Sequence, residues 1–153
     1  MKDFMEEALI EAKKAYKKGE VPIGAVIVLN GKIVSRGRNK REKSQKATDH
    51  AEIIAIEKAC KKMHSWRLEG AEIYITLEPC PMCAGAIANA RIKKVYYAAE
   101  DLSDNREIIE KIFSSTRLNH KVEYIQGTLK EESSILLSNF FKEKRESKNS
   151  HKH

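Results

Sequence analysis

Hydrophobic and polar residues follow two periods along this chain, one typical of helices and the other typical of strands. Apolar residues three or four positions apart predict five helices, over residues 3–18, 48–63, 81–90, 104–113 and 130–145. Short apolar runs predict five strands, over residues 23–29, 32–35, 71–77, 94–98 and 121–125. Asn30-Gly31 lies between the first two strands and is typical of a tight hairpin turn.

This order of elements predicts a single α/β domain over residues 1–146, with helices on both faces of a five-stranded sheet. Because a hairpin comes first and helices connect the later strands, we expect a mixed sheet. Residues 38–46 predict a polar, basic loop, and residues 147–153 predict a flexible polar tail. The helix over residues 48–63 is expected to bury Ile53, Ile56, Cys60 and Met63.

Composition and charge exclude several classes of protein. The longest apolar run, residues 22–29, is far shorter than the roughly 18–20 residues that span a bilayer, and acidic residues near the N-terminus do not fit a secretion signal. With three cysteines, which cannot all pair with one another, we expect a cytoplasmic protein rather than a disulfide-stabilised one. The 29 Lys and Arg residues exceed the 22 Asp and Glu residues, which is compatible both with a polyanionic partner and with an ordinary solvated surface.

Two short segments carry candidate chemistry. His50-Ala51-Glu52 lies at the start of one predicted helix, and Pro79–Cys83 lies at the start of the next. Together they match the H-x-E…P-C-x-x-C signature of zinc-dependent deaminases. Cys80 and Cys83 would lie side by side in a first helical turn, where the helix dipole favours thiolates. With the imidazole of His50 they make three zinc ligands and leave the fourth position open, as in catalytic zinc sites.

The residues also predict how such a site would work. Zinc lowers the pKa of a bound water towards neutrality, and Glu52 could then carry the proton of that water to the leaving amine. This requires the side chains of His50 and Glu52 to converge past the end of their helix. A redox pair or a structural zinc knuckle is disfavoured, because no thioredoxin-like apolar strand and no fourth ligand at short spacing accompany the two cysteines. Cys60 is expected to be an inert core residue.

At these residues the sequence resembles the cytidine deaminase superfamily and, within it, the branch of bacterial tRNA-specific adenosine deaminases. The resemblance extends over nearly the whole chain. The segments that carry it are Glu20–Val26, Gly37–Asn39, His50–Glu52, Ser65–Leu68, Leu77–Ala86, Ala90–Ile92, Leu118–His120 and Leu136–Phe141.

The resemblance implies a three-layer α/β/α cytidine-deaminase-like fold and one Zn²⁺ per chain, bound by His50, Cys80 and Cys83, with Glu52 as the proton shuttle. It also implies substrate contacts from Asn39, which would hold the flipped base, from Ala51, and from Asn119 near the RNA. The family acts as a homodimer and converts the wobble adenosine of a tRNA anticodon to inosine. The sequence therefore predicts hydrolytic deamination of adenosine in tRNA.

One segment departs from the pattern of that branch. Residues 100–110 are acidic and helical in pattern, where the branch usually has a loop of small residues, and residues 97–100 resemble guanine deaminases of the same superfamily. A deaminase of a free base or nucleoside stays open as an alternative, as does a non-catalytic zinc-dependent RNA-binding module, which would not need Glu52. Basic clusters within residues 40–46 and 142–148 favour RNA, because a neutral base would gain nothing from them.

Overall fold

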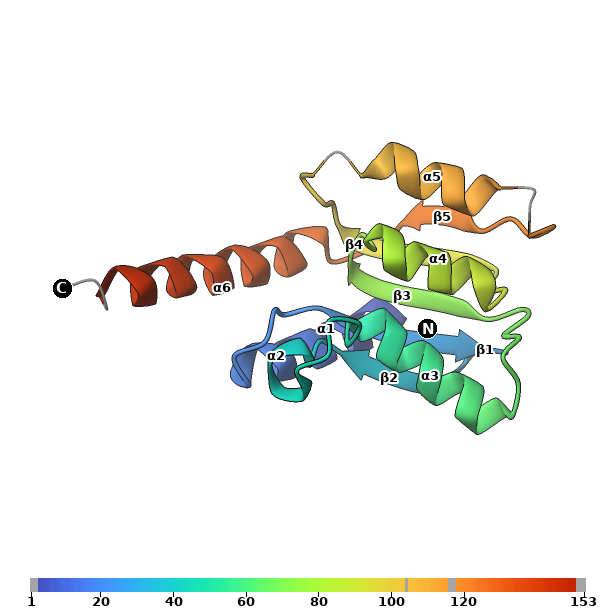
Figure 1. Ribbon diagram of the computed structural model, residues 1–153, viewed down its shortest axis with the longest axis horizontal. Coiled ribbons are helices and arrows are strands. Elements are labelled where there is room, and N and C mark those ends of the chain that lie inside the picture. Colours follow the sequence, from blue (N-terminus) through green and yellow to red (C-terminus); the bar gives the residue numbers. More distant parts are fainter. Residues whose placement is uncertain (1–2, 104, 116–117, 151–153) are drawn as a thin grey trace.

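A computed structural model describes residues 3–103, 105–115 and 118–150 and contains a mixed five-stranded sheet (Figure 1). The strands are β1 (Gly24–Leu29), β2 (Lys32–Arg38), β3 (Glu72–Leu77), β4 (Lys94–Ala99) and β5 (Glu123–Gln126), in the spatial order β2-β1-β3-β4-β5. Strand β1 is antiparallel to both β2 and β3, whereas β3, β4 and β5 are parallel. The predicted mixed α/β fold is thus confirmed.

Helices cover both faces of this sheet. They are α1 (Phe4–Lys17), α2 (Arg41–Ser44), α3 (Ala51–Met63), α4 (Pro81–Asn89), α5 (Arg106–Ser114) and α6 (Lys130–Ser150). Helices α3, α4 and α5 lie on one face, and α1 and the first half of α6 lie on the other (Figure 1). Alternate residues of β1 enter two different cores: Ala25 and Ile27 face α3 and α4, and Val26 and Val28 face α1. This double burial explains why β1 reads as an unbroken apolar run.

Three local predictions differ from the structure. The loop predicted over residues 38–46 contains the short helix α2, and β2 continues to Arg38 instead of ending at residue 35. Helix α6 continues to Ser150, so residue 147 does not mark the end of the helix. Residues 151–153 of the predicted tail and Asp104, where α5 was expected to begin, lie outside the described residues.

The buried face of α3 agrees with the prediction at Ile56, which lies in the core, but differs at other positions. Met63 is 40% exposed and Cys60 is only half-buried at the margin of the core. The residues of α3 that meet the sheet are instead mostly alanines, including Ala51 and Ala55. Small side chains take the inner positions because the helix lies unusually close to the sheet.

Gly37 of β2 permits this close approach. A Cβ atom at Gly37 would lie 2.2 Å from the carbonyl oxygen of Ala51 and 2.8 Å from the backbone nitrogen of Ala55. No side chain larger than hydrogen fits there unless the helix moves. The contact fixes the first turn of α3 against β2, and with it the His50–Glu52 segment.

Candidate active site

The two predicted motifs meet at one end of the sheet. Strand β3 ends at Leu77, and its chain then reaches Cys80, which is the N-cap of α4. His50 is the N-cap of α3. Helices α3 and α4 both begin at the end of the sheet that lies on the left in Figure 1. As the sequence predicted, each motif lies at the start of a helix.

His50, Cys80 and Cys83 form a compact cluster of possible metal ligands. Their ligand atoms all lie within 4.8 Å of one another. Nδ1 of His50 lies 3.7 Å from Sγ of Cys80 and 3.5 Å from Sγ of Cys83. In a tetrahedral zinc site, Zn–S bonds of about 2.3 Å and a Zn–N bond of about 2.0 Å place sulfur and nitrogen about 3.5 Å apart. Both the donor set and its spacing therefore fit a single metal ion.

The electrostatics of the two cysteines favour one thiolate in the metal-free site. A hydrogen bond from the Cys83 thiol, assisted by His50, lowers the pKa of Cys80 to about 4. The same pairing, together with burial, raises the pKa of Cys83 well above its usual range. The hydrogen bond to Cys80 raises the pKa of His50. Cys80 is thus prepared to bind a metal ion, whereas Cys83 has to lose a proton first.

Glu52 lies against this cluster. Its side chain is buried, with 4% of the residue exposed, and it hydrogen-bonds to Cys83. Burial is the main cause that raises the pKa of Glu52 to about 7. His50 and Glu52 therefore converge at the end of α3, as the chemistry requires. A carboxyl group with a pKa near neutrality is suited to accept and to donate a proton at physiological pH.

The structure places two of the three predicted substrate contacts at this end of the sheet. Asn39 is buried at the end of β2, and its Oδ1 accepts a hydrogen bond from the backbone N–H of Arg41 (3.3 Å). The backbone N–H of Lys40 donates to the carbonyl of Asp49 (3.1 Å), which brings Asn39 beside the residues that lead into His50. Ala51 is buried in the first turn of α3.

Asn119 lies elsewhere. It is exposed, and its neighbour His120 bonds to the carbonyl of Ile92, just before β4 begins (2.8 Å). Since β3 and β4 are parallel, this is the opposite end of the sheet from Cys80, and the α5–β5 connection lies on the right in Figure 1. Within one chain, Asn119 is not brought to the metal-binding cluster.

Glu78 is a residue of the site region whose role the sequence did not reveal. Its carboxylate is buried and pairs with Arg106 at the start of α5, and it accepts a hydrogen bond from the hydroxyl of Tyr124 in β5 (2.7 Å). Burial and this hydrogen bond raise the pKa of Tyr124. Glu78 therefore connects α5 and β5 to the segment that carries Cys80. In the sequence, the only signal for this role of Glu78 was its position two residues before that cysteine.

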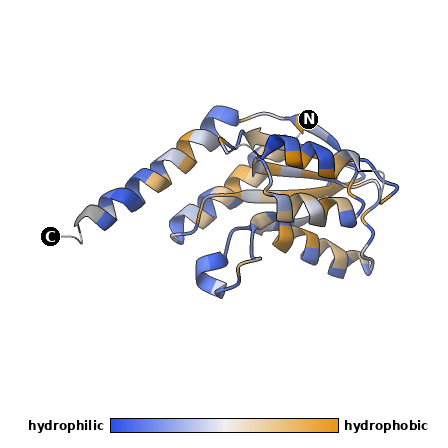
Figure 2. Cartoon of the chain, turned by 45° about the horizontal axis from the view of Figure 1, so that its top comes forward, coloured by the Kyte–Doolittle hydropathy of each residue, from blue (hydrophilic) through white to orange (hydrophobic). Residues whose placement is uncertain are grey.

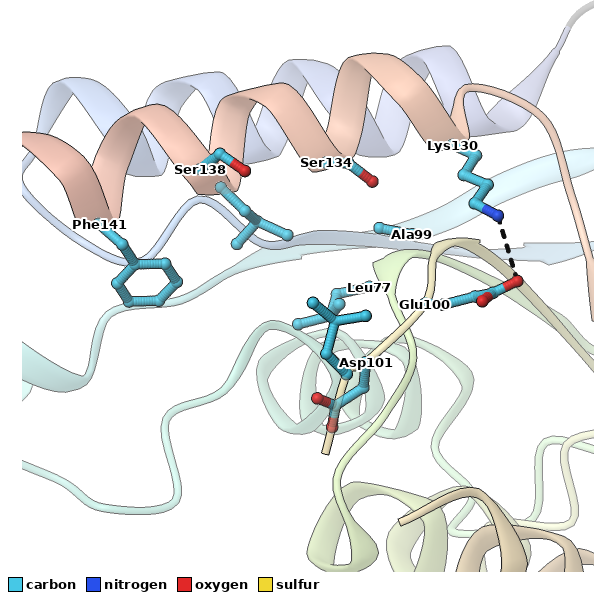
Figure 3. A pocket seen from close by; sticks show the side chains of 10 residues that line it. Leu77, Ala99, Glu100, Asp101, Lys130, Ser134, Ser138 and Phe141 are labelled. Carbon is cyan, nitrogen blue, oxygen red and sulfur yellow. Dashed lines mark hydrogen bonds and ion pairs between the residues drawn. The ribbon is translucent and has the colours of Figure 1, made fainter. Parts of the chain in front are cut away.

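A groove opens beside the ends of β3 and β4, beneath α6. It has a volume of about 420 Å³ and is lined largely by apolar side chains, among them Leu77, Ala99 and Phe141. Figure 3 shows the ring of Phe141 beside the groove and the ion pair between Lys130 and Glu100 (3.3 Å) at the other end. Phe141 is 45% exposed, so one part of its ring is free to contact a ligand. Across the described part of the chain, every helix is too short or too polar to cross a membrane.

Comparisons with known proteins agree with this site. A family model, MafB19-like deaminase, matches residues 1–145. The tRNA-specific adenosine deaminase of Bacillus subtilis strain 168 is 49% identical over 146 residues, which cover 95% of this chain and 91% of the relative. A solved structure from studies of A-to-I editing by tRNA:A34 deaminases at the wobble position of transfer RNA is 42% identical, with a TM-score of 0.74, and the match covers 81% of this chain and 96% of that one.

A guanine deaminase from Bacillus subtilis is also similar, at 35% identity and a TM-score of 0.62, over 88% of this chain and 90% of that one. The sequence identity to the tRNA deaminases is higher than that to this guanine deaminase, and it reaches far beyond the two ligand motifs. The protein belongs to the family of tRNA-specific adenosine deaminases.

Proposed function

We propose that this protein is a hydrolytic deaminase that converts adenosine to inosine at the wobble position of a tRNA anticodon. In this reaction water replaces the exocyclic amino group of the base, and ammonia leaves. The observation that carries the proposal is the placement of the buried Glu52 against a three-ligand cluster at the starts of two helices. An RNA-binding module without catalysis would not need a buried carboxylate of this kind.

We propose zinc as the metal ion, bound by His50, Cys80 and Cys83. Two sulfur ligands and one nitrogen ligand suit zinc, and three protein ligands leave one position open. When bound, zinc supplies a Lewis acid that activates water. Glu52 holds the proton that leaves the water and delivers it to the departing amine. The three cysteines are free, and thiol ligands persist in a reducing compartment, so a cytoplasmic location is part of the proposal.

The surface around the site supports RNA rather than a free base as the substrate. Helix α6 projects beyond the sheet from the end where α3 and α4 begin (Figure 1), and its outer half is largely hydrophilic (Figure 2). That half carries four exposed basic residues: Lys142, Lys144, Arg145 and Lys148. The apolar groove beneath the same helix, with the ring of Phe141, offers a surface on which an unpaired base could stack.

The acidic segment that departs from the usual family pattern is partly neutralised in the structure. Glu100 pairs with Lys130 (3.3 Å), and Glu107 pairs with Lys111 (3.3 Å). The buried side of α5 contributes Ile109 and Phe113 to the core. The charge of this segment therefore opposes RNA less than its sequence suggests.

We further propose that the protein acts as a homodimer. A hollow of about 590 Å³ lies between α4 and α5, and small or apolar residues dominate its lining, including Gly85, Ala88 and Ile112. Ile108, in the same lining, is 48% exposed. A second copy covering this face would bury apolar surface and could bring its own Asn119 towards the neighbouring site, where the resemblance expects that residue to contact RNA.

The test is to incubate the zinc-loaded protein with an anticodon stem-loop that carries a wobble adenosine, and in parallel with free adenosine and free guanine, while measuring ammonia and inosine. The same stem-loop with a wobble guanosine is the matched control. We expect ammonia and inosine only from the adenosine stem-loop. Ammonia from free guanine, with none from the stem-loop, would contradict the proposal and favour the guanine deaminase alternative.

A further inference from the structure

Glu20 is a buried acidic residue that has no contact with the metal-binding cluster. It lies between α1 and β1 and is 4% exposed. Its Oε1 accepts a hydrogen bond from the backbone N–H of Glu42 (3.0 Å), and its Oε2 accepts one from the backbone N–H of Lys43 (2.9 Å). Both oxygens of a buried carboxylate are therefore used to bind the first turn of α2.

Helix α2 depends on this distant carboxylate. The residue at its N-cap, Lys40, makes no capping hydrogen bond with its own side chain. The three free N–H groups of the first turn are satisfied from outside: Asn39 accepts from Arg41, and Glu20 accepts the other two. A helix of four residues is not stable by itself, so these contacts determine whether it forms.

Asn39 and Glu20 thus both accept hydrogen bonds from the first turn of α2. Because Oδ1 of Asn39 bonds to the same helical turn that Glu20 holds, the orientation of the Asn39 amide depends on that turn staying in place. The amide nitrogen of Asn39 is left to donate to a ligand. Next to Asn39, the backbone N–H of Lys40 donates to the carbonyl of Asp49, which directly precedes His50.

Positively charged side chains around α2 repel one another, which opposes the packing of this helix against the rest of the protein. Lys18, Lys40 and Lys43 line one small pocket together with Glu20. Burial and the nearby cations Lys58, Arg38 and Lys43 lower the pKa of Lys40, and Asp49 opposes this shift only in part. Crowded cations suit a surface that binds phosphates, but they repel one another while no RNA is bound. A buried carboxylate directly beneath them opposes that repulsion and holds the loop together.

We propose that Glu20 is a positioning residue for the RNA substrate: by capping α2 it fixes Asn39 and the basic loop over residues 40–46, without touching either the substrate or the metal ligands. This inference rests on the proposed function. It predicts that loss of the Glu20 carboxylate weakens substrate binding and leaves the metal-binding cluster intact.

The experiment compares Glu20→Gln with Glu11→Gln in the full-length, zinc-loaded protein. Glu11 is an equally buried carboxylate, but its ion pairs are with Lys14, Arg36 and Arg38 and not with residues of α2. In Glu20→Gln an amide N–H₂ faces a backbone N–H, so we expect KM for the adenosine stem-loop to rise roughly tenfold, with kcat and zinc content within about twofold of the parent. Glu11→Gln is expected to lower thermal stability without changing KM.

A double-mutant cycle with Asn39→Ala separates positioning from a general loss of stability. If Glu20 acts through Asn39, Glu20→Gln should raise KM less in the Asn39→Ala background than in the parent. Equal KM in Glu20→Gln and the parent, an equal rise in Glu11→Gln, or strict additivity with Asn39→Ala would each overturn the inference. Failure of the parent itself to deaminate the stem-loop would overturn the proposed function, and the inference with it.

Discussion

At the scale of single residues, the site combines groups whose protonation the fold has changed. Burial of Glu52 brings its pKa to about 7. Of the two neighbouring cysteines, Cys80 has a lowered pKa and favours the thiolate, whereas Cys83 has a raised pKa and keeps its proton. Perturbed groups of this kind gather where proton transfer or metal binding takes place.

Glu52→Ala should keep its zinc but lose turnover. The substitution removes the proton carrier and leaves all three ligands in place. General acid–base catalysis contributes about 10²–10⁴-fold to a rate, so we expect kcat on the stem-loop to fall by about that factor. Zinc is measured by elemental analysis beside the turnover assay, and turnover near the parental rate would show that Glu52 does not carry the proton.

Zinc affinity should increase with pH. In the metal-free site the pKa values of both Cys83 and His50 are raised, so protons occupy these ligands near neutrality and compete with the metal. As pH rises, protons compete less with the metal, so zinc should bind more tightly. Titration against a chromophoric chelator at pH 6 and at pH 8 should show this tighter binding at the higher pH.

Cys83→Ser should lose both zinc and stability, whereas Cys60→Ala should keep its zinc. Equal loss of zinc in the two variants would mean that the ligands are wrongly assigned.

At the scale of helices and strands, a few contacts between distant segments decide where the site residues lie. Gly37 sets the first turn of α3 against β2, Glu20 caps α2, and Glu78 holds the start of α5. Each contact joins a segment of the site to a part of the chain that is remote in sequence.

Arg106→Ala should loosen α5. It leaves the carboxylate of Glu78, which is 4% exposed in its side chain, without its cationic partner. Since hydrogen bonds to charged groups contribute about 1.5–3 kcal/mol and Arg106 itself is partly solvated, we expect a loss of about 1–2 kcal/mol in the free energy of unfolding. Urea unfolding measures this loss, and hydrogen exchange should show faster opening of α5.

Lys111→Ala is the matched control for that experiment. Lys111 belongs to the same helix and pairs with Glu107 (3.3 Å), but both side chains are more than three-quarters exposed, at 76% and 81%. Exposed pairs of this type contribute about 0.3–0.5 kcal/mol, so the control should change little. If both variants were equally stable, Glu78 would not anchor α5.

Elements specified by local sequence could be predicted, and contacts between distant segments could not. The Asn30-Gly31 hairpin, the strands and the two ligand motifs each follow from neighbouring residues. Helix α2 escaped prediction because its cap, Glu20, comes from a different loop. On α3 the prediction was confirmed for Ile56, which is buried in the core, but was wrong for Met63. Hydrophobicity favours isoleucine and methionine over alanine, whereas the short distance to Gly37 demands small side chains.

In the site too, residues placed by local sequence could be predicted, and residues placed by distant parts of the chain could not. The two signature motifs were enough to predict that His50, Cys80 and Cys83 come together, because each ligand lies at or near the start of a helix. Nothing in the spacing of Asn119 tells at which end of the sheet it lies. Its position follows from the direction of α5, which returns the chain to the end opposite the site before β5 begins (Figure 1).

At the scale of the whole molecule, charge and shape are unevenly distributed. The ligand cluster and the groove lie where β3 and β4 end. Helix α6 projects from this end of the sheet, and the last turn of α3, which contains Lys61 and Lys62, lies at the opposite end (Figure 1). We therefore expect an RNA bound at the site to contact the basic residues of α6 rather than those of α3.

Replacing Lys142, Lys144 and Arg145 by alanine should weaken binding of the stem-loop and reduce its dependence on salt. Each phosphate contact on a single strand contributes roughly −0.7 to the slope of log K against log salt, so losing three should flatten the slope by up to about 2. Filter binding or anisotropy at several salt concentrations measures this. Lys61→Ala with Lys62→Ala is the control and should leave the slope unchanged. An unchanged slope in the α6 variant would exclude phosphate contacts by these residues.

The separation of Asn119 from the cluster of its own chain has a consequence for mixtures of inactive proteins. If each site is built from Glu52 of one subunit and Asn119 of its partner, neither Glu52→Ala nor Asn119→Ala alone contains an intact site. Co-expressed in equal amounts, the two variants would form mixed dimers in which one of the two sites is whole, and roughly a quarter of all sites would be restored. Recovered inosine formation in the mixture, absent from either variant alone, would show that the catalytic unit is shared between chains. If instead Asn119→Ala alone were fully active, each site would work without the partner's Asn119.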